Sequence, residues 1–163
     1  MPKDCVLSLL VSNHFGVLTR VTNLFSRRGF NIKSLAVGET ERPSLSRITI
    51  LTDGDENKSD QIQKQLNKLY DVKQTFALPT DALILRELLL IKLKNTDETA
   101  LLTLLEKSGA KKLAEADSFL IAELTGPRKE IDAFVKQAEP FGILEMCRTG
   151  EAALENSKNT IYP

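Results

Sequence analysis

The chain has no tryptophan, one histidine and two cysteines in 163 residues, and its 22 Lys and Arg residues balance its 22 Asp and Glu residues. The absence of net charge removes any global attraction to nucleic acid or to an anionic membrane. Two cysteines and one histidine cannot supply the ligands of an ordinary structural zinc site. No apolar run approaches the roughly 18–20 residues that span a bilayer. We therefore expect no nucleic acid, no membrane and no metal among its partners.

Catalytic motifs are absent as well. The only histidine is His14, and the sequence contains no G-x-S-x-G elbow, no G-x-x-x-x-G-K-[ST] and no G-x-G-x-x-G. The abundant carboxylates fall on expected helix faces and turns, where a solvated surface explains them. We expect no catalytic residue in this chain.

Cysteine usage and the amino end indicate a compartment. Cys5 and Cys147 lie in apparent strands, where we expect buried, reduced thiols. The stretch after Met1-Pro2-Lys3-Asp4 lacks a clear signal-peptide cleavage region. A cytoplasmic location is the resulting expectation.

The residue pattern predicts the same order of elements twice. In the first half, short apolar or alternating runs predict strands at 5–11, 31–37, 45–51 and 72–78, and helical spacing follows Val17 and Ile62. The second half repeats this with strands at 85–93, 111–116, 119–124 and 142–147 and helices around Leu101 and Ile131. Thr96 is the expected cap of the third helix and Pro127 the expected first residue of the fourth.

This order predicts an α+β protein made of two tandem ferredoxin-like βαββαβ modules. We place the first module at residues 1–78, a linker at 79–84, the second module at 85–149 and a weakly structured tail at 150–163. Modules this small, with open sheets, favour oligomerisation through sheet edges or helices.

One turn has the composition of a ligand site. The first strand passes through Asn13-His14-Phe15-Gly16 directly into a helix at Val17 and Leu18. A helix start presents unpaired N–H groups that suit a carboxylate, and the Asn13 carboxamide can donate to a carboxylate or accept from an ammonium. We expect a free amino acid there. The alternative is a plain strand-to-helix turn with Asn13 as a local cap.

The internal repeat favours the ligand interpretation. The matching turn in the second half is Asn95-Thr96-Asp97-Glu98-Thr99, which has no glycine and two acidic side chains. Acidic side chains at that position would repel a carboxylate. Folding alone does not require this difference between the two modules.

The residues around the turn resemble a known family. Asn13-x-x-Gly16-Val17-Leu18, followed by Arg20-Val21 and the stretch from Leu24 to Ile32, closely resembles the small regulatory subunit of acetolactate synthase (acetohydroxyacid synthase). Further matches are Ser46-Arg47-Ile48-Thr49-Ile50, Asp71-Val72, Glu123-Leu124-Thr125-Gly126 and Arg148-Thr149-Gly150. The resemblance covers roughly residues 4–150, and the tail after Gly150 diverges from it.

The resemblance implies that residues 1–78 form an ACT domain and that the chain dimerises through paired ACT domains. It implies that valine, or a related branched-chain amino acid, binds between two protomers. It also implies that the chain activates a large catalytic subunit and confers feedback inhibition on it. Thiamine diphosphate, magnesium and FAD would belong to that large subunit. The implied site residues are Asn13, Gly16, Val17 and Leu18 from one protomer, with Asn31 and Ile32 from the facing strand.

Three alternatives share the expected topology. An RNA-recognition module needs aromatic residues on its central strands, and Ser46–Ile50 has none. A small hydrolase of the acylphosphatase type could use the glycine turn as an anion cradle, with Arg20 or Arg47 assisting. An ACT regulator of another enzyme, or a transcriptional sensor, is the third.

Overall fold

The computed structural model describes residues 4–79 and 82–162, and the chain divides into two compact units. Unit 1 comprises residues up to Ile84 together with Glu151 onward, and unit 2 comprises Leu85–Gly150. Residues 80 and 81 of the expected linker, and Met1-Pro2-Lys3 at the amino end, lie outside the described residues. No helix in the described ranges is long and apolar enough to cross a bilayer.

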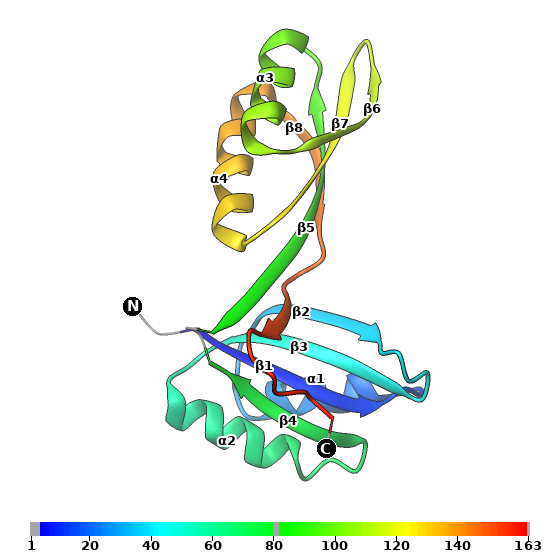
Figure 1. The fold of residues 1–163 in the computed structure, drawn as a ribbon, viewed down its shortest axis with the longest axis vertical. Coiled ribbons are helices and arrows are strands. Elements are labelled where there is room, and N and C mark those ends of the chain that lie inside the picture. Colours follow the sequence, from blue (N-terminus) through cyan, green and yellow to red (C-terminus); the bar gives the residue numbers. More distant parts are fainter. Residues whose placement is uncertain (1–3, 80–81, 163) are drawn as a thin grey trace. The chain divides into compact units, whose positions relative to one another are not determined.

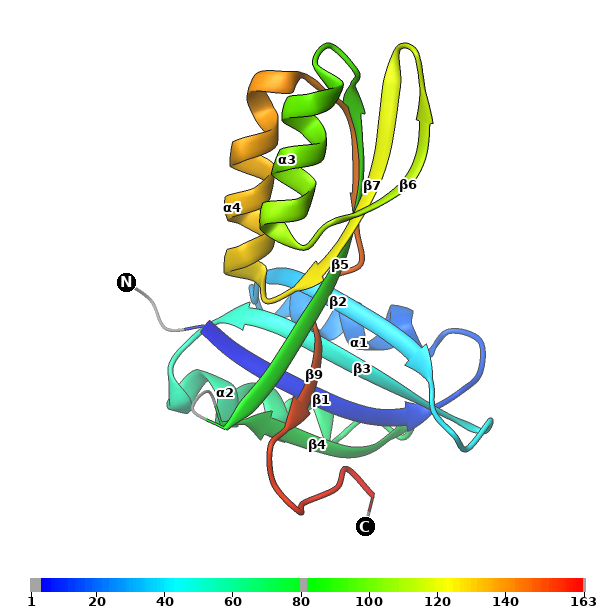
Figure 2. The ribbon, with the colours of Figure 1, turned by 45° about the horizontal axis from the view of Figure 1, so that its top comes forward.

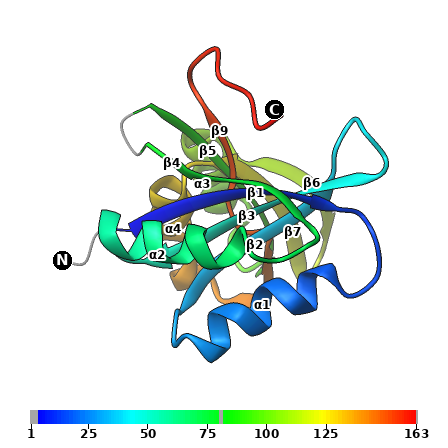
Figure 3. The same ribbon diagram turned by 90° about the horizontal axis from the view of Figure 1, so that it is seen from below.

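Unit 1 contains a four-stranded antiparallel sheet in the order β2-β3-β1-β4, with two helices on one face (Figures 1 and 3). Its elements are β1 (Asp4–Ser12), α1 (Val17–Arg27), β2 (Ile32–Glu39), β3 (Leu45–Asp53), α2 (Glu56–Leu66) and β4 (Val72–Leu78). Alternate residues of a strand point to opposite faces. The helices therefore pack on one residue set of β1, which is Cys5, Leu7, Leu9 and Val11.

The core of unit 1 follows from the helical apolar stripe. Val17, Val21 and Phe25 recur at helical spacing on α1 and are buried against the sheet. Phe25 also meets the ring of Phe30 edge-on, with the two ring centroids 6.1 Å apart. Glycine at position 29, with φ of +68°, allows the chain to leave the helix and enter β2.

Unit 2 repeats the arrangement, with a sheet in the order β6-β7-β5-β8 and α3 and α4 on one face (Figure 2). Its elements are β5 (Leu83–Lys94), α3 (Glu98–Ser108), β6 (Lys111–Ala116), β7 (Phe119–Gly126), α4 (Arg128–Ala138), the 3-10 turn η1 (Glu139–Phe141) and β8 (Ile143–Arg148). The strands β5, β6, β7 and β8 take the same places in this sheet as β1, β2, β3 and β4 take in the sheet of unit 1. The prediction of two ferredoxin-like βαββαβ modules is confirmed.

Several local expectations differ from the structure. Asp97, not Thr96, caps α3, because its carboxylate accepts a hydrogen bond from the Ala100 N–H at 3.0 Å. Pro127 precedes α4 and occupies its cap position rather than its first turn. Cys5 is buried as expected, but Cys147 is exposed on β8.

The segment after Gly150 also differs from the weak structure expected for it. It forms strand β9 (Ala152–Glu155), and it belongs to unit 1. The Arg47 Nη2 donates to the Ala153 carbonyl at 2.8 Å, and Tyr162 donates to Glu41 at 2.7 Å. These partners are about a hundred residues away in sequence, so the composition of the tail alone did not reveal them.

Candidate functional site

The glycine turn connects the end of β1 to the start of α1. Gly16 has φ of +84°, in the left-handed region that favours glycine, and it occupies the cap position of α1. Among residues 4–79 and 82–162, no side chain caps this helix, and its first turn contains no acidic residue. The N–H groups at the start of α1 are thus available to an external acceptor.

The equivalent helix in unit 2 has its amino end occupied. Asp97 caps α3 with its own carboxylate, and Glu98 lies in the first turn. A carboxylate at a helix amino end satisfies its N–H groups and its dipole. The first module therefore leaves open the position that the second module fills with its own side chain.

The predicted site residues take different parts in this turn. The Asn13 side chain donates from Nδ2 to the Pro43 carbonyl at 2.9 Å, which leaves its amide oxygen as an acceptor. Val17 is only 4% exposed and packs in the core, so it can offer a ligand its backbone N–H but not its side chain. Leu18 is 40% exposed and can offer both.

Asn31 and Ile32 lie at the other end of the sheet in the same chain. Ile32 pairs with Thr52, whereas Ser12, next to the glycine turn, pairs with Leu45. These positions are separated by most of the length of a nine-residue strand, about 25 Å at the usual rise per residue. One chain brings together Asn13, Gly16, Val17 and Leu18, but not Asn31 and Ile32.

The end of the sheet near Asn31 is held by charge pairs. Lys33 contacts the carboxylates of Asp4, at 2.6 Å, and Asp53. The Lys33 hydrogen bond lowers the pKa of Asp53, and a smaller contribution comes from the Asn31 side chain. The same two carboxylates raise the pKa of Lys33. The Asn31 carbonyl accepts from the Thr52 hydroxyl at 2.6 Å, so the entry to β2 is fixed.

A buried carboxylate beneath the turn was not anticipated from sequence. Asp71 is 6% exposed, and its two oxygens meet His14 Nε2 at 2.9 Å and Arg20 Nε at 2.6 Å. Its backbone carbonyl also accepts from the Ser12 N–H at 2.8 Å. Asp71 thereby connects the strand end, the turn and the first turn of α1. The matched pair Asp71-Val72 in the family resemblance was the one sequence signal for it.

We expect Asp71→Asn to loosen this turn. The substitution removes the charge that His14 and Arg20 contact, and the loss of these partly exposed, charge-assisted hydrogen bonds costs about 1–2 kcal/mol. Urea unfolding, combined with hydrogen exchange of the amides in β1 and α1, measures the effect. Asp60→Asn, at an exposed position of α2, is the matched control. An equal change in both variants would contradict the role assigned to Asp71.

Chemistry beyond binding has little support at this turn. Within the described part of the chain, no group of three or more His, Cys, Asp or Glu side chains could hold a metal ion. The only histidine contacts a carboxylate already shared with Arg20. An open helix amino end beside an amide oxygen is instead suited to bind a carboxylate and an ammonium together.

Comparisons with known proteins agree over nearly the whole chain. Residues 7–74 match the family described as the AHAS small subunit-like ACT domain, and residues 86–157 match the small subunit of acetolactate synthase. A probable acetolactate synthase small subunit of Methanothermobacter thermautotrophicus is 38% identical over 163 residues, which is 98% of this chain and 97% of that protein. The acetolactate synthase small subunit of Mycolicibacterium smegmatis is 39% identical over 158 residues, which is 95% of this chain and 92% of that protein.

A solved structure has the same fold throughout. The crystal structure of the acetolactate synthase small subunit from Thermotoga maritima superimposes with a TM-score of 0.91 at 35% identity, and the match covers 96% of this chain and 99% of that one. The family matches and these identities span both modules. This chain belongs to the acetolactate synthase small subunit family, with an ACT domain in its first half.

Proposed function

We propose that this chain is the regulatory subunit of an acetolactate synthase in branched-chain amino acid biosynthesis. It performs no catalysis itself, activates the large catalytic subunit, and transmits feedback inhibition by valine. Thiamine diphosphate, magnesium and FAD are bound by the catalytic subunit, and the assembly works in the cytoplasm. Family membership supports the partner, and the open glycine turn supports the ligand.

The observation that carries the ligand proposal is the uncapped amino end of α1. A free amino acid places its carboxylate on the N–H groups at Val17 and Leu18, where no side chain of the described residues competes. The amide nitrogen of Asn13 is engaged by Pro43, so its oxygen accepts from the ammonium. The half-exposed Leu18 side chain then meets the aliphatic part of the ligand.

A dimer completes this site. In the sheet order β2-β3-β1-β4, β2 is an edge strand, and such an edge pairs readily with a second copy. Antiparallel pairing about a twofold axis puts the start of one β2 beside the end of the other. The glycine turn lies at the same end of the sheet as the end of β2, so Asn31 and Ile32 of the second protomer meet it there.

Regulation follows from differential affinity. Valine that bridges two ACT domains favours one dimer geometry over another, and the catalytic subunit binds the two geometries with different affinity. A coupling free energy of about 1–3 kcal/mol changes affinity by about 5–150-fold. A small difference in binding free energy between the two dimer geometries is therefore enough for regulation.

Calorimetric titration of the intact chain with valine, leucine and isoleucine tests the ligand. We expect saturable binding of at least valine, with one ligand for each glycine turn or one for each dimer. D-valine is the control, because it carries the same groups in the wrong arrangement. Reconstitution with the catalytic subunit should then raise acetolactate formation and make it sensitive to valine. Absence of binding to all three, together with unchanged catalytic activity, would contradict the proposal.

A further inference from the structure

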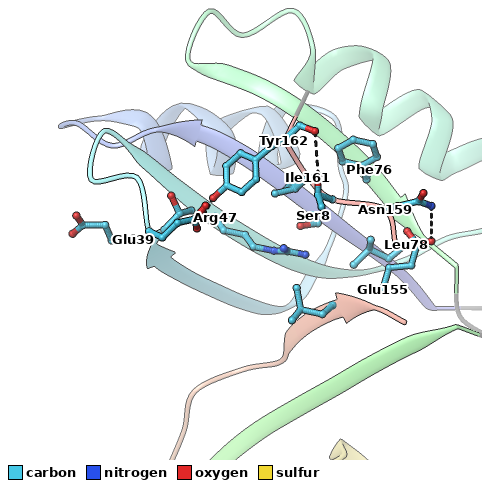
Figure 4. Close-up of a pocket in the computed structure, with 13 residues that line it drawn as sticks. Ser8, Glu39, Arg47, Phe76, Leu78, Glu155, Asn159, Ile161 and Tyr162 are labelled. Carbon is cyan, nitrogen blue, oxygen red and sulfur yellow. Dashed lines mark hydrogen bonds between the residues drawn. The ribbon is translucent and has the colours of Figure 1, made fainter. Parts of the chain in front are cut away.

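A cavity lies on the face of the unit 1 sheet that is opposite the two helices. It has a volume of about 540 Å³ and lies between the sheet and residues 154–162 of the tail (Figure 4). Ser8 and Arg47 line it from β1 and β3, and its apolar walls are Phe76, Leu78, Leu154 and Ile161. All of these residues belong to unit 1. The volume is in the range of small-molecule sites.

Two polar groups in this cavity have unused hydrogen-bonding capacity. Ser8 is 1% exposed, and its Oγ has no hydrogen-bond partner among residues 4–79 and 82–162. Arg47 Nε is likewise buried and unpartnered in these ranges, although its Nη2 donates to the Ala153 carbonyl. Leaving such groups unpaired costs free energy, so their presence under the tail needs an explanation.

The two groups are placed to act together. Ser8 pairs with Thr49 and Leu10 pairs with Arg47, so Ser8 and Arg47 are diagonal neighbours on one face of adjacent strands. Figure 4 shows Arg47 extended in the space between the sheet and the tail. Arg47 takes part in none of the ion pairs found between described residues, and burial lowers its pKa. A hydroxyl beside an unpaired guanidinium is a pattern that binds a carboxylate.

We propose that this cavity binds a small organic monocarboxylate with an apolar body. The carboxylate accepts from Arg47 Nε and from the Ser8 hydroxyl, and the body packs against Phe76, Leu78 and the tail. Glu39 lies exposed at the rim, where it can distinguish a ligand that carries an ammonium from one that does not. None of the glycine-turn residues lines this cavity, so the proposal does not depend on the valine site.

The tail closes the cavity, so ligand binding should change the hydrogen exchange of the tail. Leu154 and Ile161 form its outer wall, and Tyr162 holds the end of the tail through Glu41 and through stacking of Arg42 on its ring at 4.0 Å. A ligand in the cavity adds contacts to this wall. Hydrogen exchange of amides in residues 152–162 should therefore slow when ligand binds.

The test is titration of the intact chain carrying Gly16→Asp, which blocks the proposed valine site, with 4-methylpentanoate, 3-phenylpropanoate and leucine, followed by calorimetry and hydrogen exchange. We expect saturable binding of at least one, slower exchange in the tail, and at least tenfold weaker binding of 4-methylpentanamide, which lacks the charge. A preference for leucine over 4-methylpentanoate would identify an amino acid ligand, and the reverse would identify a simple carboxylic acid.

Variants separate a binding role from a structural one. Ser8→Ala should weaken binding about fivefold to tenfold while leaving the melting temperature unchanged or higher, because it removes an unpaired buried hydroxyl. Arg47→Met should weaken binding at least tenfold, and the exposed Ser26→Ala should leave it unchanged. The proposal is overturned if no probe saturates, if the amide binds as well as the acid, or if Ser8→Ala lowers stability and leaves binding intact.

Discussion

Replacing Gly16 with aspartate is expected to abolish valine inhibition of the reconstituted holoenzyme while leaving the subunits assembled. The new carboxylate occupies the amino end of α1, where the ligand carboxylate would otherwise bind, and it repels that ligand. A negative charge at this end favours the helix dipole, so the helix itself is not weakened by the charge. We expect at least a hundredfold loss of apparent valine affinity, equivalent to about 3 kcal/mol.

A second variant separates the backbone strain of Gly16→Asp from the effect of its charge. A Cβ at Gly16 would lie 3.1 Å from Arg20 Nη1, the far end of a flexible side chain, and φ of +84° disfavours most residues. Asparagine has nearly the shape of aspartate, and both tolerate this backbone region better than other residues. Gly16→Asn therefore reproduces the strain without the charge and should retain more valine sensitivity. Normal inhibition of the Gly16→Asp enzyme would show that the site lies elsewhere.

Arg148→Met is expected to lower the free energy of unfolding of unit 2 by about 3 kcal/mol, in the range for breaking a buried ion pair. Glu87 is 6% exposed, and both its oxygens accept from Arg148, at 2.9 and 2.7 Å. Arg148 also donates to Asp132 of α4 at 2.7 Å, and the bonds to Glu87 raise its pKa. Removing the guanidinium leaves the buried Glu87 carboxylate without its partner. The methionine side chain cannot donate a hydrogen bond to this carboxylate.

Hydrogen exchange of amides in β5 and β7 measures this loss, since both tyrosines of the chain lie in unit 1 and report poorly on unit 2. Lys92→Met is the matched control. Lys92 meets the well-exposed Glu145 at 3.6 Å, and such surface pairs contribute about 0–1 kcal/mol. If the two variants destabilise unit 2 equally, burial of Glu87 is not the source of the effect.

The sequence predicted the architecture because the architecture depends on local patterns. Alternation in β1 and helical spacing of Val17, Val21 and Phe25 are visible without the fold, and so is the repeat of six elements. The glycine turn was found for the same reason. The sequence also shows that the matching turn of the second module, around Asp97, has no glycine. The structure adds that Asp97 caps helix α3 of that module.

What the sequence did not reveal depends on distant partners. Carboxylates were expected on the surface, but Asp71 and Glu87 are buried because His14, Arg20 and Arg148 reach them from other elements. Arg47 meets Ala153 from 106 positions away. No periodicity encodes such contacts. The cavity beneath the tail was missed for this reason, since half of its wall comes from a segment with no apolar pattern.

The return of the tail to unit 1 has a consequence for how the chain is made. Ser8 and Leu78 leave the ribosome before unit 2 does, but the residues that close the cavity above them, Leu154 and Ile161, leave it after unit 2. The whole of unit 2 is translated in between. One face of the first sheet therefore stays uncovered by the tail while unit 2 is synthesised. A chain terminated before Leu154 would lack the residues that cover that face.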